Sequence, residues 1–137
     1  MSSINLKLEI AKIGRLIEKL KELSLKSFVC TKSITELEEI ISFQPDFIAI
    51  EPPELIGTKK SISSENPSLI KECFKLIKKE NQNIQLICGA GINTKKDIEI
   101  ALENGAQGIL VSSSITKADN WHNKIFELAS AFLTKTK

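Results

Sequence analysis

The most restrictive feature of this 137-residue sequence is its alternation of short apolar segments with longer segments of helical apolar spacing. Apolar residues at i, i+3, i+4 and i+7 predict an amphipathic helix, whereas short apolar runs bounded by turn residues predict strands. The predicted strands are residues 27–30, 47–50, 84–88 and 108–111, and the predicted helices are residues 8–23, 34–44, 67–80, 95–104 and 119–133. The order is therefore one helix followed by four strand–helix units.

Strands that alternate with helices predict a parallel sheet with right-handed crossovers. Four such units are half of a (β/α)8 barrel, which typically has roughly 250 residues, and they also suffice for a small open doubly wound sheet. A chain of 137 residues is long enough for one domain with its own core. We therefore predict a single α/β domain over residues 1–137, and both architectures remain open.

Polar residues at the expected helix ends support these boundaries. Ser33 and Glu36 have the spacing of a capping box, in which each side chain satisfies a free backbone N–H. Asn66 before Pro67 is typical of a helix start, and Gly105 is the type of residue expected just after a helix end.

The last helix is expected to bury one apolar face against the domain. That face comprises Ile125, Phe126, Leu128, Ala129 and Phe132. Trp121, at the start of this helix, is expected to cover the rim of the core. His122 is the only histidine of the chain and is expected to lie on the surface.

Composition excludes several classes of function. The net charge is +2 and the lysines are scattered, with Arg15 the only arginine, which argues against a nucleic-acid surface. No apolar run approaches the ~18 residues that span a bilayer, and the start of the chain has no signal-like apolar core. Cys30, Cys73 and Cys88 form no CxxC pair, so we expect core cysteines in a reduced, cytoplasmic protein without a metal or other cofactor.

The stretch from Phe47 to Thr58 holds the first candidate for chemistry. An apolar run ends in Glu51, and Pro52 stops the strand because it has no N–H for the ladder. Glu51 is then expected at the carboxyl end of a buried strand, where active sites of parallel α/β proteins lie. The alternative is an acid that ends a strand and faces water. The connection over residues 51–65 lacks helical periodicity, and its length is typical of a lid or binding loop.

Two further loops are expected at the same end of the sheet. Gly89-Ala90-Gly91 and Ser112-Ser113-Ser114 each follow a predicted strand and precede a helix. Such turns expose backbone N–H groups that bind anions, so a phosphate could sit between them with Gly57 of the long connection above it. Each glycine taken alone is also explained by an ordinary turn. Lys59 and Lys60 either attract that phosphate or are simply solvated, and Glu54 is read as a surface or lid residue.

These motifs resemble a known family. The strings EPPELIGT at residues 51–58, CGAGI at residues 88–92 and GILVSS at residues 108–113 closely resemble the C-terminal half of archaeal-type triosephosphate isomerase, from about residue 8 onward. The resemblance implies the second half of a TIM (β/α)8 barrel. It also implies interconversion of glyceraldehyde 3-phosphate and dihydroxyacetone phosphate, as in glycolysis and gluconeogenesis, without a cofactor.

The resemblance also implies residue roles. Glu51 matches the catalytic base, residues 52–60 match the lid, and Gly57 matches the lid glycine whose N–H contacts the phosphate. The remaining phosphate-binding positions match Ala90, Gly91, Ser112 and Ser113. A carboxylate shielded from water is a stronger base, and a closed lid retains the reactive intermediate.

The sequence also departs from the family pattern. The resemblance covers only four of the eight strands, without the first-strand lysine motif N-x-K. Counting back from the first helix puts Ser3 at the catalytic histidine of the N-H-S-E string and Asn5 at its glutamate, and Ser114 stands where archaeal members usually have glycine. We therefore expect weak or no isomerase activity alone, and either a homo-oligomer or assembly with a complementary N-terminal half. The alternatives are a non-catalytic phosphate-binding half-barrel and a fragment without function.

Overall fold

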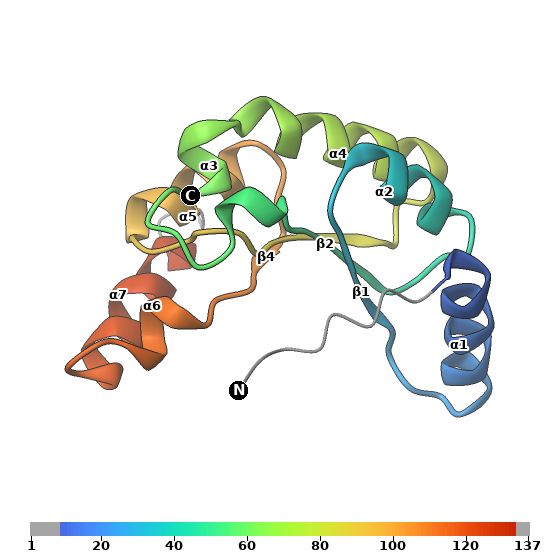
Figure 1. Cartoon of the computed structure of the whole chain (residues 1–137), viewed down its shortest axis with the longest axis horizontal. Helices are drawn as coiled ribbons and strands as arrows, with labels where there is room; N and C mark the ends of the chain where they lie inside the picture. The colour runs from blue at the N-terminus through green and yellow to red at the C-terminus, as the bar shows by residue number, and fades with distance from the viewer. Residues whose placement is uncertain (1–8, 134–137) are drawn as a thin grey trace.

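The computed structural model describes residues 9–133 as one curved parallel sheet with helices along its convex side (Figure 1). The strands are β1 (Phe28–Thr31), β2 (Phe47–Ile50), β3 (Gln85–Cys88) and β4 (Gly108–Ile109). The helices are α1 (Ile10–Glu22), α2 (Ile34–Ile41), the 3-10 helix η1 (Pro53–Leu55), α3 (Ile62–Glu65), α4 (Pro67–Glu80), α5 (Lys95–Glu103), α6 (Ser113–Thr116) and α7 (Trp121–Leu133). The predicted alternation of strands and helices is confirmed.

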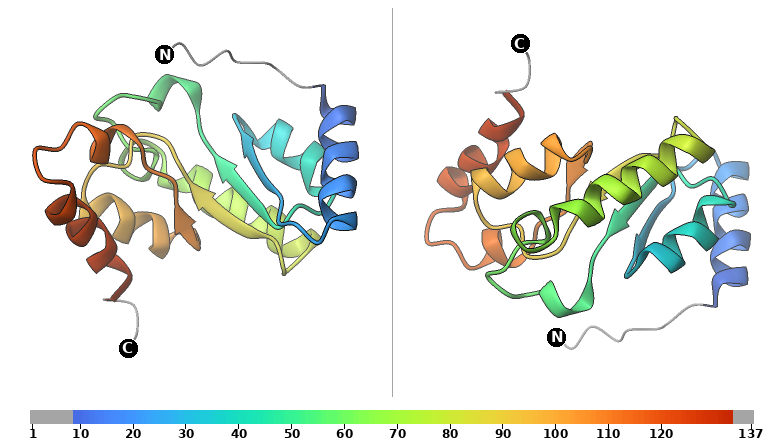
Figure 2. Two further views of the ribbon diagram at one scale, coloured as in Figure 1. Left: turned by 90° about the horizontal axis from the view of Figure 1, so that it is seen from below. Right: turned by 90° about the horizontal axis from the view of Figure 1, so that it is seen from above.

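The strand order β1-β2-β3-β4 follows the chain, and all neighbouring pairs are parallel. A doubly wound sheet changes direction within its strand order, whereas a barrel adds each new strand on the same side. The sequential order and the curvature in Figures 1 and 2 therefore decide between the two predicted architectures in favour of half a (β/α)8 barrel.

The alternation of side chains along the strands separates two faces of the sheet. Ile48 and Ile50 of β2 are fully buried in the core under the helices, together with Leu86 and Cys88 of β3. Helix residues such as Leu37, Ile70 and Ile98 complete this core at 0% exposure. Each buried side chain of this size contributes about 1.5–3 kcal/mol to folding.

The opposite, concave face carries the other strand residues. The rings of Phe28 and Phe47 stack there with centroids 5.9 Å apart, and Phe28 is 47% exposed. No helix among residues 9–133 covers this face, as the lower side of the arch in Figure 1 shows. Cys30 lies on the same face and is exposed, so its prediction as a core residue was wrong. Cys73 and Cys88 are buried, as predicted.

Side-chain caps fix the helix starts as the sequence predicts. Ser33 Oγ accepts a hydrogen bond from Glu36 N–H (3.3 Å), while the Glu36 carboxylate accepts one from Lys32 N–H (2.9 Å). Asn66 Oδ1 accepts a hydrogen bond from Leu69 N–H (3.2 Å). Each cap satisfies a backbone N–H that the helix itself leaves free.

Two predicted elements are shorter or more structured than expected. Only Gly108 and Ile109 of the last predicted strand pair with β3. The connection over residues 51–65 was predicted without helix, yet it contains the short helices η1 and α3. Both are single turns, too short to show an apolar period in the sequence.

The predicted inner face of the last helix was wrong in most positions. α7 buries Leu128 and Ala131, whereas Ile125, Phe126 and Phe132 are exposed. The helix packs on α5 and α6 along one edge, and nothing else in residues 9–133 covers its remaining apolar surface. Trp121 is 61% exposed, so it does not cover the core rim as predicted.

Asp46 fastens the amino end of the sheet. Its carboxylate accepts hydrogen bonds from Ser27 N–H (2.8 Å), Ser27 Oγ (3.0 Å) and Lys26 Nζ (2.6 Å). The hydrogen bond from Lys26, followed by that from the Ser27 backbone, lowers the pKa of Asp46 to about 2. This cluster joins the starts of β1 and β2 and lies at the opposite end of the strands from Glu51.

Candidate functional site

Glu51 follows the last residue of β2, and its N–H donates to the Thr31 carbonyl oxygen of β1 (2.8 Å). The strand register continues from Ile50 and Cys88 to Glu51 and Gly89, so these two residues lie side by side. A Cβ atom on Gly89 would lie 2.5 Å from Oε1 of Glu51. Glycine at position 89 therefore leaves the room that the Glu51 carboxylate occupies.

On the adjacent strand β1, the side chain of Cys30 lies near Glu51. Cys30 is exposed as a residue, but its thiol is partly buried. This partial burial, followed by a hydrogen bond to Glu51 and the charge of Glu51, raises the pKa of the thiol to about 12. The thiol therefore stays protonated next to the carboxylate. Sequence reasoning missed this contact, because it depends on the strand register. Cys30 pairs with Ala49, which places the thiol on the same face of the sheet as Glu51, two residues further along.

A cavity of about 240 Å³ lies at the carboxyl ends of β2, β3 and β4. The lid segment and the turn that follows β4 both line this cavity, and the two segments also lie beside each other in Figure 2. The residues lining it are Glu51, Ile56, Gly57, Thr58, Gly89, Gly91, Ile92, Asn93, Leu110, Val111, Ser112, Ser113 and Ser114. Five of the six predicted site residues thus line one cavity.

Ala90 is the predicted site residue that does not line the cavity. Its side chain is fully buried, and its carbonyl oxygen accepts a hydrogen bond from Ile62 N–H (3.0 Å). This hydrogen bond connects the loop after β3 to the start of α3, which follows the lid.

The lid over residues 52–60 is held at its base and open at its tip. Leu55 is buried, and its carbonyl oxygen accepts a hydrogen bond from Thr58 Oγ1 (2.8 Å). Gly57 has φ of +72° and no atom within 4 Å of the position of a Cβ. Lys59 and Lys60 are exposed, and so is Glu54. The tip of this segment is therefore exposed, with free space around Gly57.

The turn Ser112-Ser113-Ser114 after β4, here called the serine turn, closes the far side of the cavity. Ser112 carbonyl oxygen accepts hydrogen bonds from Ile115 N–H and Thr116 N–H, both 3.0 Å, which starts the single turn of α6. Ser114 Oγ is buried and has no hydrogen-bond partner among the described residues. A buried hydroxyl without a partner is unfavourable, so a ligand oxygen bound here would relieve that cost.

Charge is sparse in the cavity. Glu51 is the only ionisable residue among the described residues that line it. Within residues 9–133, no group of three or more His, Cys, Asp or Glu residues is placed to hold a metal ion. His122 lies exposed at the start of α7, as predicted. Ser3 and Asn5, at the family's histidine and glutamate positions, lie outside the described residues.

Solved structures with the same arrangement share this architecture. The chain superposes on thiamine phosphate pyrophosphorylase from Pyrococcus furiosus with a TM-score of 0.66 and 20% identity, covering 88% of this chain and 56% of that one. It superposes on N-acetylmannosamine-6-phosphate 2-epimerase from Clostridium perfringens with a TM-score of 0.61 and 18% identity, covering 88% and 48%. The fold and the position of the cavity therefore define a half-barrel of the TIM (β/α)8 class.

Sequence comparison identifies the family within that class. The family model for triosephosphate isomerase matches residues 9–129. The chain is 40% identical to triosephosphate isomerase of Methanocaldococcus jannaschii over 119 residues, which are 87% of this chain and 54% of that enzyme. It is 43% identical to that of Cenarchaeum symbiosum over 119 residues, 87% and 53% of the two chains. The chain belongs to the triosephosphate isomerase family and spans about half the length of these relatives.

No helix within residues 9–133 is both long and apolar enough to cross a membrane.

Proposed function

We propose that this chain carries the base, the lid and the phosphate-binding loops of a triosephosphate isomerase. The observation that carries this proposal is the shared cavity, in which Glu51 faces the same space as Gly57, Gly91 and the serine turn. The reaction is the interconversion of glyceraldehyde 3-phosphate and dihydroxyacetone phosphate, as in glycolysis and gluconeogenesis, in the cytoplasm.

The chemistry follows from the positions of these groups. The Glu51 carboxylate takes a proton from the hydroxyl-bearing carbon next to the substrate carbonyl and returns it to the former carbonyl carbon. In the same isomerisation, the hydroxyl oxygen loses its proton and becomes the new carbonyl, and the former carbonyl oxygen gains a proton. Backbone N–H groups near Gly91, Ser112 and Ser113 hold the phosphate. The lid brings Gly57 over the phosphate and excludes water, which strengthens the base and protects the intermediate.

The cavity lacks the positive charge that this reaction needs. Proton abstraction builds negative charge on the substrate oxygen, and preorganised donors or cations usually stabilise it. Among the described residues that line the cavity, none is cationic. We therefore propose that the half-barrel described here has weak or no activity by itself and that an N-terminal half of the barrel supplies the missing groups. A non-catalytic phosphate-binding half-barrel is the second candidate, and the same absence of a cation favours it.

Phosphate recognition by the isolated chain is the first prediction. Titration with glyceraldehyde 3-phosphate is expected to shift the amide NMR signals of Gly91 and Ser113, whereas unphosphorylated glyceraldehyde leaves them unchanged. Inorganic phosphate should compete. Equal shifts with the two aldehydes, or shifts confined to other parts of the chain, would be incompatible with a phosphate site between these loops.

The surface for this N-terminal half is a groove along the free edge of β1. A cavity of about 600 Å³ lies between the apolar face of α1 and this edge. Its apolar lining comprises Ile10, Ile13, Leu16, Ile17, Leu20, Phe28, Val29 and Ile40. An edge strand has unpaired backbone groups, so a strand that enters under α1 gains hydrogen bonds on one side and apolar contacts on the other.

We propose that the occupant of this groove is a strand from an N-terminal half of the same family. The described chain forms four of eight barrel strands and spans 54% of the M. jannaschii enzyme, so the remainder of such an enzyme has the complementary length. A strand in the groove pairs with β1 and continues the barrel there. The other end of the N-terminal half then pairs with the free edge of β4, which closes the ring.

Leu16→Glu tests this groove. Leu16 is 51% exposed on α1, so the substitution places a charge in the groove without opening the core. Sedimentation or light scattering with the N-terminal half of the M. jannaschii enzyme is expected to show a one-to-one complex, weakened at least about tenfold by Leu16→Glu. Lys75→Glu, on the exposed side of α4 between the two free edges of the sheet, should leave the complex intact. Self-association that Leu16→Glu abolishes, without binding of the half-barrel, would assign the groove to a second copy and contradict the proposal.

A further inference from the structure

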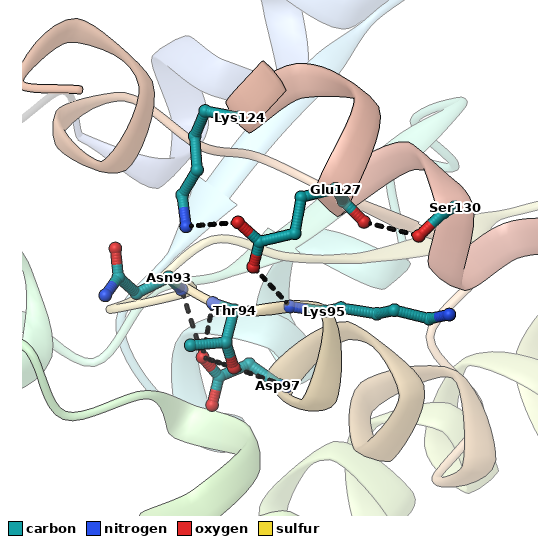
Figure 3. A network of polar contacts seen from close by, with 7 residues as sticks. All are labelled: Asn93, Thr94, Lys95, Asp97, Lys124, Glu127 and Ser130. Atoms are coloured by element: carbon teal, nitrogen blue, oxygen red, sulfur yellow. Dashed lines mark hydrogen bonds and ion pairs between the residues drawn. The ribbon is translucent and has the colours of Figure 1, made fainter. Parts of the chain in front are cut away.

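One buried carboxylate connects the end of the lid to the loop between β3 and α5 (residues 89–94), which is the proposed phosphate-binding loop. Asp97 lies in the first turn of α5 and is 8% exposed. Its Oδ1 accepts hydrogen bonds from Ser61 Oγ (2.6 Å) and Ser64 Oγ (3.0 Å), which belong to the start of α3 directly after the lid. Its Oδ2 accepts from Asn93 N–H (3.1 Å), Thr94 N–H (2.8 Å) and Thr94 Oγ1 (2.9 Å), where the loop after β3 enters α5 (Figure 3).

The two oxygens therefore have different partners. Oδ2 completes the capping box with Thr94, which is an ordinary helix-start function. Among the described residues, Oδ1 bonds only to the two serines, which lie 33 and 36 residues earlier in the chain. The helix needs no such contact, so the Oδ1 bonds require a separate explanation.

Close backbone packing at the same place shows what these bonds hold together. Gly91 has φ of +67°, and a Cβ atom there would overlap the carbonyl oxygen of Lys60. Ile62 N–H donates to the Ala90 carbonyl oxygen (3.0 Å), and Ser61 is 1% exposed. The end of the lid thus lies directly against the loop whose Gly91 lines the cavity.

The charge of Asp97 suits this position. Burial raises the pKa of its carboxyl, but hydrogen bonds from Ser61, from the backbone at Thr94 and Asn93, and from the Thr94 hydroxyl outweigh burial, and the pKa lies below its ordinary value. The carboxylate is therefore ionised at neutral pH, and hydrogen bonds to a charged acceptor are roughly twice as strong as neutral ones.

A second contact holds the start of α5 on its exposed side. Glu127 of α7 accepts a hydrogen bond from Lys95 N–H (3.4 Å), the residue after Thr94, and pairs with Lys124 (3.0 Å), as Figure 3 shows. The start of α5 is thereby fixed on its exposed side, while Asp97 fixes the lid on its buried side.

We propose that Asp97 is a positioning residue that anchors the C-terminal end of the lid to the phosphate-binding loop, so that the lid pivots from a fixed point over the cavity. The inference deepens the proposed function, since it assumes that these loops bind the phosphate of the substrate. Asp97 itself is absent from the cavity lining and acts through Ser61 and Ser64.

Variants can separate the anchor from the helix cap. Ser61→Ala with Ser64→Ala removes both donors to Oδ1 and keeps the capping box. Thr94→Ala is the matched control, because it removes a donor to Oδ2 and keeps the bonds to the lid. Ser64→Ala alone is the milder variant, since Ser61 also caps α3. Ser61→Thr with Ser64→Thr retains both hydroxyls as the conservative rescue.

Amide hydrogen exchange over residues 56–62 and tryptic cleavage after Lys59 and Lys60 measure how often the lid detaches. Both rates are expected to rise at least about tenfold in the double alanine variant and severalfold in Ser64→Ala, and to return toward the original in the threonine variant. Thr94→Ala should raise exchange at the start of α5 and leave the lid rates unchanged. Unchanged lid rates in the double alanine variant, or an equal rise in Thr94→Ala, would refute the anchor.

Phosphate affinity separates failure of the anchor from failure of the proposed function. The double alanine variant is expected to bind inorganic phosphate at least severalfold more weakly than the original chain. If no variant and not even the original chain binds phosphate, the proposed function fails, while the exchange and cleavage rates still decide whether Asp97 anchors the lid.

Discussion

Glu51→Gln is expected to lower isomerase turnover by roughly 10²–10⁴-fold in the barrel formed with an N-terminal half. Glutamine has the shape of glutamate but does not accept a proton at neutral pH. It also fits the space that Gly89 leaves beside β3, so the fold should be unaffected. Because the phosphate-binding loops are unchanged, the Michaelis constant should change by much less than turnover.

Steady-state kinetics with glyceraldehyde 3-phosphate measures this effect, and the thermal unfolding midpoint verifies that the variant folds. Glu38→Gln is the matched control, because Glu38 is an exposed glutamate on α2 away from the cavity. Retained turnover in Glu51→Gln would exclude Glu51 as the base. An equal loss in Glu38→Gln would show that the effect arises from the loss of one negative charge on the protein rather than from the loss of the base.

Gly91→Ala is expected to have the largest effect on stability of any single methyl addition in the site. The added Cβ would overlap the Lys60 carbonyl oxygen and lie 2.7 Å from the Lys60 carbonyl carbon and 3.0 Å from Ser61 Cα. Position 91 also has φ of +67°, which strains an L-residue by about 1–3 kcal/mol. The lid end and the phosphate-binding loop must separate, so the free energy of unfolding and the phosphate affinity should both fall.

Gly57→Ala provides the comparison for Gly91→Ala. Gly57 has a similar φ of +72°, but no atom lies within 4 Å of its Cβ position. Alanine there adds the backbone strain alone, about 1–2 kcal/mol. Urea unfolding of the two variants therefore separates strain from collision. Equal losses of stability would mean that the two loops part without cost and would argue against their rigid contact.

The sequence predicted the parts of the fold in which local and global preferences agree. Residues 47–50 are apolar and are followed by Glu51 and the strand-breaking Pro52, and the strand has these bounds in the structure. Asn66 and Pro67 start α4 as their capping chemistry requires. The exposed face of α7 was not predictable, because an apolar stripe shows which side avoids water but not whether another element covers it.

The candidate site was predictable to the extent that it lies at strand ends. Glu51, Gly91 and the serines after β4 meet because the carboxyl ends of neighbouring parallel strands lie together. Contacts across the fold were not predictable. Asp97 reads in the sequence only as a helix-capping residue, and its bonds to Ser61 and Ser64 depend on the path of the lid between β2 and α4.

The measurement that tests the central claim most directly is isomerase turnover of this chain mixed with the N-terminal half of the M. jannaschii enzyme. We expect turnover only when both polypeptides are present, and we expect Glu51→Gln to remove it. A one-to-one complex that shows no turnover, or turnover that persists in Glu51→Gln, would contradict the claim that this chain carries the catalytic half of a triosephosphate isomerase.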